Sequence, residues 1–199
     1  MFWVGGVLPL VLCVVLVFAL PESISFFIAF MMLVTNSAWA PTLLKREGIG
    51  IKEASLAMAS FNLGSVIATS FAGWLISRAG AAVILPLVML GSAVSMALVG
   101  YAAPSVGLVI LLQGLFGLFM GGGSSGLIAL AAIYYPTAIR STGVGWAMGM
   151  GRVGSFSGPL AVGSLVGLGL STAGIFVAIA VPALLAVATT AAAGRLKAA

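Results

Sequence analysis

The chain has 199 residues, of which 62% are hydrophobic and only 6% are charged. Eight basic and three acidic side chains cannot cover a soluble domain of this size, so the composition indicates an integral membrane protein. The net charge of +5 comes from basic residues scattered singly through short polar stretches, which excludes the clustered basic surface of a nucleic-acid-binding protein.

The apolar runs are about 20 residues long and do not alternate, which predicts membrane helices rather than a barrel. We expect about seven helices in an all-α integral membrane fold. The first run lacks the basic start and the cleavage site of a signal peptide, so we expect a retained helix. The predicted helices cover about residues 2–20, 24–44, 53–77, 81–101, 106–135, 142–167 and 172–194.

Arg152 is the foremost candidate for function, because it lies well inside the sixth predicted helix. At 1.5 Å per residue it is roughly 13–14 Å from the start of that helix, near the midplane where transporters bind substrates. A guanidinium group binds a carboxylate through two parallel hydrogen bonds. The alternative is structural, with Arg152 bonded to backbone carbonyls or to a local polar partner.

Other polar and aromatic side chains are candidate ligand contacts. Ser155 and Phe156 follow Arg152 by about one turn and share its face, where a hydroxyl could hydrogen-bond a ligand and a phenyl ring could stack on one. Asn36, Asn62 and Gln113 are amides inside predicted helices. Amides in lipid connect helices as often as they bind ligands, and ordinary packing is the alternative for each residue.

Glycines recur four residues apart, for example at Gly117 and Gly121 and at Gly154 and Gly158, which indicates close helix packing. Proline removes a backbone donor, so Pro159 predicts a kink in the sixth helix. No histidine is present and Cys13 is the single cysteine, so we expect no metal site and no cofactor. The sequence holds no set of paired catalytic groups, and we expect no enzyme.

Four stretches resemble the major facilitator transporters, and most closely their aromatic acid:proton symporter branch. Residues 20–23 (LPES) resemble the end of the sixth transporter helix, and residues 39–44 (WAPTLL) resemble the outer end of the seventh. Residues 73–80 (GWLISRAG) resemble the gating motif between helices eight and nine, with Ser77 in place of its aspartate. Residues 135–159 resemble the tenth-to-eleventh helix region most strongly.

The resemblance implies helices six to twelve of a twelve-helix transporter. It divides the chain into residues 1–23, a helix with a short linker, and residues 24–199, a six-helix C-terminal bundle. It also implies proton-coupled symport of small organic carboxylates, aromatic ones foremost, with Arg78 and Arg140 in gating. The alternatives are a truncated non-transporting membrane module and a self-assembling half-transporter.

The implied partners are the lipid bilayer, the organic anion, protons, and either an N-terminal half or a second copy that supplies the coupling acids. We expect the inner membrane of a bacterium, with the N-terminus outside. Basic residues in short loops favour the cytoplasmic side. In this orientation the inner loops hold Arg78, Arg140, Arg195 and Lys197, and the outer loops hold Lys45, Arg46 and Lys52.

Overall fold

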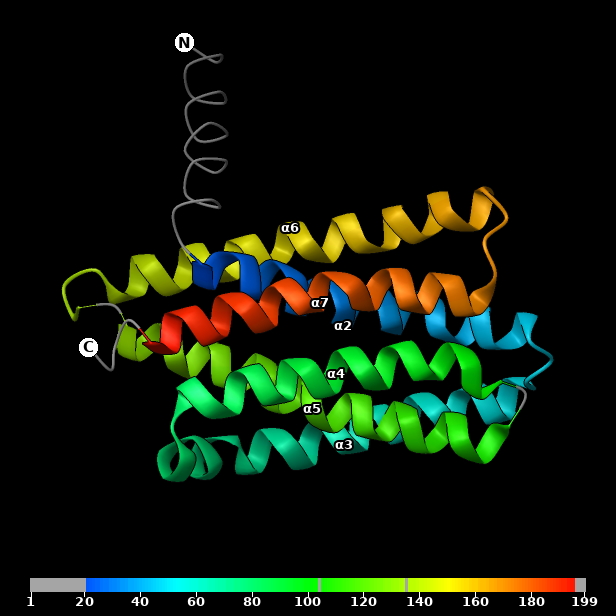
Figure 1. Ribbon diagram of the computed structural model, residues 1–199, viewed down its shortest axis with the longest axis horizontal. Helices are drawn as coiled ribbons and strands as arrows, with labels where there is room; N and C mark the ends of the chain where they lie inside the picture. Colours follow the sequence, from blue (N-terminus) through cyan, green and yellow to red (C-terminus); the bar gives the residue numbers. More distant parts are fainter. Residues whose placement is uncertain (1–20, 104, 135, 196–199) are drawn as a thin grey trace, which may run out of the picture.

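The structure is a computed structural model that describes residues 21–103, 105–134 and 136–195 (Figure 1). The described residues form six α-helices joined by short turns. The helices are α2 (Pro21–Arg46), α3 (Ile51–Ala79), α4 (Ala81–Ala102), α5 (Val106–Tyr134), α6 (Arg140–Gly167) and α7 (Thr172–Arg195).

The six helices confirm the all-α fold and the second to seventh predicted helices. The first predicted helix, residues 2–20, lies outside the described residues. Five of the described helices, rather than the seven predicted spans, are long and apolar enough to cross a membrane. The exception, α6, is a helix where one was predicted, but glycines, serines, Arg140 and Arg152 lower its hydropathy.

Neighbours in sequence run antiparallel, yet the main packing joins helices that are not consecutive (Figure 1). Helix α3 packs against α5, α2 against α6, and α4 against α7. Helices α3 and α6 therefore form opposite edges of the bundle, with α2 and α5 between them. If α2, α3 and α4 are exchanged with α5, α6 and α7, the same pairs of packed helices result. The corresponding helices α2 and α5 run in opposite directions, as in an inverted repeat.

Glycines make the two edge contacts close. A side chain at Gly117 of α5 would collide with the backbone carbonyl of Phe61 in α3. On the other edge, a side chain at Gly154 of α6 would collide with the carbonyl of Phe27 in α2. The predicted close packing is confirmed at these glycines. At Gly145 and Gly149, by contrast, no described atom lies within 4 Å of the place that a Cβ would occupy, so these two glycines border open space.

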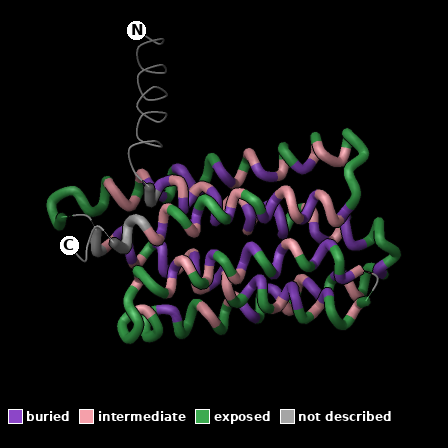
Figure 2. Tube along the Cα trace, in the orientation of Figure 1, coloured by how far each residue is buried: buried purple, intermediate pink, exposed green. Residues whose placement is uncertain are grey.

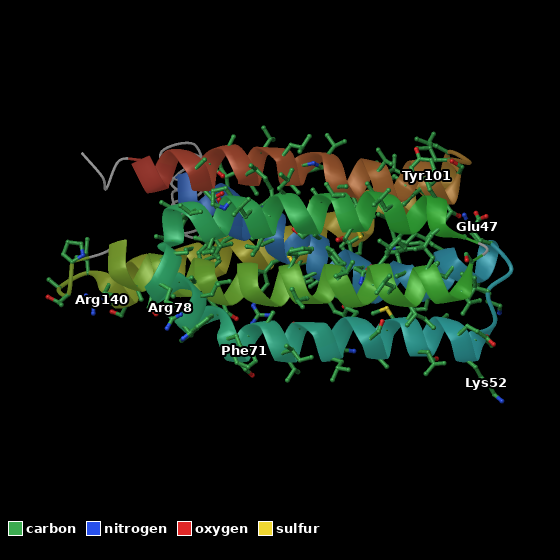
Figure 3. The ribbon with its side chains drawn as sticks, turned by 60° about the horizontal axis from the view of Figure 1, so that its bottom comes forward. Glu47, Lys52, Phe71, Arg78, Tyr101 and Arg140 are labelled. Carbon is green, nitrogen blue, oxygen red and sulfur yellow. The ribbon has the colours of Figure 1, made fainter. Side chains whose placement is uncertain are left out.

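Exposed residues run along the length of the bundle (Figure 2), and many of them are large and apolar. Leu63 is 63% exposed on α3, and Leu185 is 62% exposed on α7. Charged side chains lie at the two ends: Glu47 and Lys52 at one, Arg78 and Arg140 at the other (Figure 3). An apolar belt between two charged ends is the surface expected of a helical bundle in a lipid bilayer.

Candidate functional site

Arg152 lies on the outer side of an edge helix. It is the thirteenth of the 28 residues of α6, and it is exposed. Gly151, Gly154 and Gly158 lie on the opposite side of α6, which packs against α2. No described residue pairs with its guanidinium group. A cation halfway along a helix of a membrane bundle is costly without water or a counter-ion, so this side of α6 should face a cavity, a partner or an anion.

Phe156 and Ser155 follow Arg152 in the next turn of α6. Phe156 is 75% exposed and lies four residues after Arg152, so the two side chains are neighbours on the outer side. Ser155 is half-buried, and its hydroxyl donates to the Gly151 carbonyl at 3.0 Å. The exposed cation and the exposed phenyl ring form the part of the predicted site that α6 presents directly.

A hollow of about 440 Å³ runs along the first half of α6, and Arg152, although not part of its lining, follows the lining residue Gly149 by three positions. Its described lining is Thr142, Gly145, Trp146, Gly149, Met150 and Val153. These positions are spaced three and four residues apart, so they share one face of the helix. Gly149 lies three residues after Trp146 and three before Arg152, which places it between those two side chains on the helix surface.

The indole nitrogen of Trp146 is buried and has no hydrogen-bond partner among the described residues. An unpaired buried donor destabilises a protein by about 1–3 kcal/mol, so its retention needs an explanation. The sequence did not single out Trp146 as a site residue. Its position between Gly145 and Gly149 could have identified it, because there a bulky side chain with a hydrogen-bond donor lies beside two residues without side chains.

Asn36 and Gln113 bond to each other across the centre of the bundle. Nδ2 of Asn36 donates to Oε1 of Gln113, and Nε2 of Gln113 donates to Oδ1 of Asn36, both at 3.1 Å. The two side chains are 1% and 0% exposed. The pair joins α2 to α5, which are the first helices of the two corresponding halves α2–α4 and α5–α7. Their role as ligand contacts remains a prediction, and in this arrangement the amides bind each other.

Asn62 lies apart from the other predicted ligand contacts. It is exposed on α3, at the edge opposite α6, and its Nδ2 donates to the Met58 carbonyl at 2.9 Å. It is the twelfth of 29 residues in its helix. The structure thus pairs Asn36 with Gln113 and groups Arg152 with Phe156, but it brings Asn62 next to neither group.

The two predicted gating arginines lie at the same end of the bundle (Figure 3). Arg78 is in the last turn of α3, with its guanidinium carbon 4.7 Å from the centre of the Trp74 ring. Arg140 is the first residue of α6 and is exposed. Ser77 stands where the resembling motif has an aspartate, and its hydroxyl donates to the Trp74 carbonyl at 2.8 Å. The contact of Arg78 with an aromatic ring is therefore local to α3.

Helix α2 holds α6 near Pro159. Nε1 of Trp39 donates to the Pro159 carbonyl at 3.1 Å, and the Thr35 side chain contacts Gly158 in α6. Trp39 is half-buried and bonded to a helix backbone. Because Pro159 has no N–H, the Ser155 carbonyl lacks its usual helical donor, so this bond supports α6 where its own ladder is weakest.

No group of three or more histidine, cysteine or acidic residues that could hold a metal occurs within the described ranges. The remaining chemistry is that of a cation, a phenyl ring and a hollow on the outer side of a membrane helix. Such features in a multi-pass helical bundle are typical of membrane transport proteins, which bind organic ligands between helices.

Comparison with known proteins gives the family. The sequence pattern of the Major Facilitator Superfamily matches residues 23–196, and the chain belongs to this family. Its relatives include the 3-(3-hydroxy-phenyl)propionate transporter of Escherichia coli, 32% identical over 89% of this chain and 51% of that protein.

Two further relatives carry names of the same kind. The 4-hydroxybenzoate transporter PcaK of Pseudomonas aeruginosa is 32% identical over 83% of this chain and 37% of its own length. The benzoate transport protein of Acinetobacter baylyi is 32% identical over 83% of this chain and 35% of its own length. The matches confirm the resemblance to the aromatic acid transporters, and the chain spans about half or less of the length of these relatives.

Proposed function

We propose that this chain is the C-terminal half of a proton-coupled symporter for small aromatic carboxylates, and that Arg152 binds the carboxylate. The observation that carries the proposal is an exposed arginine halfway along α6, without a partner among the described residues and beside an exposed phenyl ring and a hollow. A carboxylate would supply the missing counter-ion, and Arg152 could bind it in a bidentate manner. The relatives' names point to aromatic acids as the class of anion.

The other predicted residues take secondary roles in this proposal. Phe156 stacks on the ring of the substrate, and Ser155 offers a hydroxyl one turn from Arg152. Asn36, Gln113 and Asn62 are further ligand contacts, which for the buried amide pair requires α2 and α5 to separate. Arg78 and Arg140 act in gating at the end of the bundle where they both lie.

Proton coupling needs acidic groups inside the membrane. Among the side chains that the structure describes, the acidic ones are Glu47 and Glu53, both at one end of the bundle. We therefore propose that the coupling acids come from an N-terminal half or from a second copy of the chain. We also propose that the chain lies in the inner membrane of a bacterium.

A non-transporting membrane module is the second candidate. Ser77 replaces the aspartate of the gating motif, and Arg78 contacts Trp74 in its own helix. A gate that depends on an ion pair between helices would be weakened by both features. Uptake of labelled 4-hydroxybenzoate into vesicles that hold the chain together with an N-terminal half separates the candidates, because the module would show no uptake above empty vesicles.

The experiment on the site is Arg152→Lys, with binding of 4-hydroxybenzoate normalised to folded protein. Lysine keeps the charge but loses the planar fork. Loss of one charge-assisted hydrogen bond costs about 1.5–3 kcal/mol, so we expect an affinity about ten- to a hundred-fold lower. Arg46→Lys, at the end of α2, is the matched control and should bind as the unaltered chain does. Equal normalised affinity for Arg152→Lys would leave Arg152 with a structural role.

A further inference from the structure

We propose that Trp146 determines which aromatic acids bind, by donating its indole N–H to a polar group at the end of the ring opposite the carboxylate. This inference rests on the proposed role of Arg152. The ring would lie over Gly145 and Gly149, with its carboxylate on Arg152. The favoured substrates are then aromatic acids that carry a second hydrogen-bond acceptor, such as a phenol oxygen.

The floor of the hollow suits a flat ring. Gly145 and Gly149 have no side chain, and no described residue occupies the space where one would lie. Met150 and Val153 line the same hollow with apolar atoms. All of its described lining comes from α6, so the hollow of about 440 Å³ is an open groove along one face of this helix. These two glycines thus leave room for a ligand, whereas the corresponding space at Gly151 and Gly154 of the same helix is filled by Phe30 and Phe27 of α2.

The spacing along α6 matches a ligand with polar groups at both ends. Trp146 and Arg152 are six residues apart, which is about 9 Å at 1.5 Å per residue. Both side chains lean towards the start of the helix, so this offset is largely kept between their polar ends. Gly149 lies between them, and a benzene ring substituted at opposite ends can bridge such a gap.

The donor itself gives the selectivity. Nε1 of Trp146 is covered and has no partner within the described ranges, so a ligand acceptor that reaches it after a small turn of the indole would satisfy it. A bare benzoate would leave it unpaired. Sites built to hydrogen-bond a substrate group discriminate against the analogue that lacks the group, because the protein donor is then left buried and unsatisfied.

The test compares 4-hydroxybenzoate with benzoate on the full chain in lipid nanodiscs, alone and with a co-expressed N-terminal half. Trp146→Phe keeps an aromatic ring and removes the donor. We expect a roughly ten-fold loss of affinity for 4-hydroxybenzoate, equivalent to about 1.4 kcal/mol, and unchanged affinity for benzoate. Trp74→Phe, on α3, is the control and should alter neither affinity.

A second measurement keeps the proposal testable if Trp146→Phe folds poorly. In the unaltered chain labelled with 5-fluorotryptophan, 4-hydroxybenzoate should shift the fluorine resonance of Trp146 and leave that of Trp74 in place. Binding without a shift at Trp146, or equal affinities of Trp146→Phe and the unaltered chain for both acids, overturns this inference and leaves the role of Arg152 standing. If neither acid binds the unaltered chain in either preparation, the proposed function fails and this inference with it.

Discussion

Polar side chains in the membrane part of this bundle follow two different patterns. Asn36 and Gln113 are buried and satisfy each other, whereas Arg152 and Asn62 are exposed halfway along the edge helices. A buried amide pair needs no ligand to be stable, but an exposed arginine at this depth needs a counter-ion. The difference separates residues that hold the helices together from residues that are available to bind.

The amide pair should behave as a coupled unit. Asn36→Ala leaves Gln113 buried with both of its bonds lost, so we expect it to lower the free energy of unfolding by about 1–3 kcal/mol. Gln113→Ala should cost a similar amount. Because each single change breaks the same two bonds, the double variant should cost less than the two single costs added together.

Unfolding in mixed micelles, followed by circular dichroism, measures this double-mutant cycle. Additive costs would show that the two amides do not support each other. The same variants also test the proposed ligand role of the pair: a loss of 4-hydroxybenzoate affinity beyond the loss of folded protein would place the amides in the binding site.

At the scale of helices, glycine sets which pairs come close. Two edge contacts, α3 with α5 and α2 with α6, each bring a glycine of one helix against a backbone carbonyl of the other. Lipid tails are as apolar as leucine side chains, so association depends on such close packing rather than on the burial of apolar surface. Helix α6 therefore uses one glycine set to bind α2 and another, Gly145 and Gly149, to keep a hollow open.

Two glycines of α5 provide a matched test. Gly117→Ala places a methyl group against the Phe61 backbone, which cannot move without its helix, and overpacking of this kind costs about 1–3 kcal/mol. Gly107→Ala enters open space in the same helix and should be neutral or stabilising by up to about 1 kcal/mol. Thermal unfolding of the two variants in detergent decides the matter. Equal midpoints would mean that the α3–α5 contact does not depend on this glycine.

At the scale of the whole molecule, the two triplets of helices pack in the same pattern with opposite directions. The two triplets meet between α2 and α5, where Asn36 and Gln113 bond to each other. Transporters built from inverted repeats place their sites where the repeats meet, and they move one bundle against another. In this chain Arg152 and Asn62 are exposed halfway along the edge helices α6 and α3.

The orientation of the bundle in the membrane is a prediction at the scale of the whole molecule. Basic residues at the Arg78 and Arg140 end favour the cytoplasm. With Cys13 replaced by serine, Thr137→Cys lies at that end, in the turn before α6, and Glu47→Cys lies at the other. An impermeant thiol reagent added to intact cells should label Glu47→Cys and spare Thr137→Cys. The reverse pattern of labelling would invert the orientation.

The positions of the helices followed from the sequence alone. Apolar runs of membrane length, separated by charges, glycines and prolines, predicted α2 to α7 to within a few residues, because each helix satisfies its own backbone in lipid. Arg152 also stood out in the sequence, since a charge in such a run is rare. The motifs around it led to the family that the comparisons confirm.

The pairing of the helices was decided only by the tertiary structure. Asn36 and Gln113 are 77 residues apart, and no local pattern indicates that they bond to each other. Gly145 and Gly154 look alike in sequence, yet one faces open space and the other the backbone of α2. Periodicity indicates which residues share a face of a helix. The residues that pack against this face come from helices distant in the chain. These contacts between helices determine whether a polar side chain is hydrogen-bonded within the bundle or free to bind a ligand.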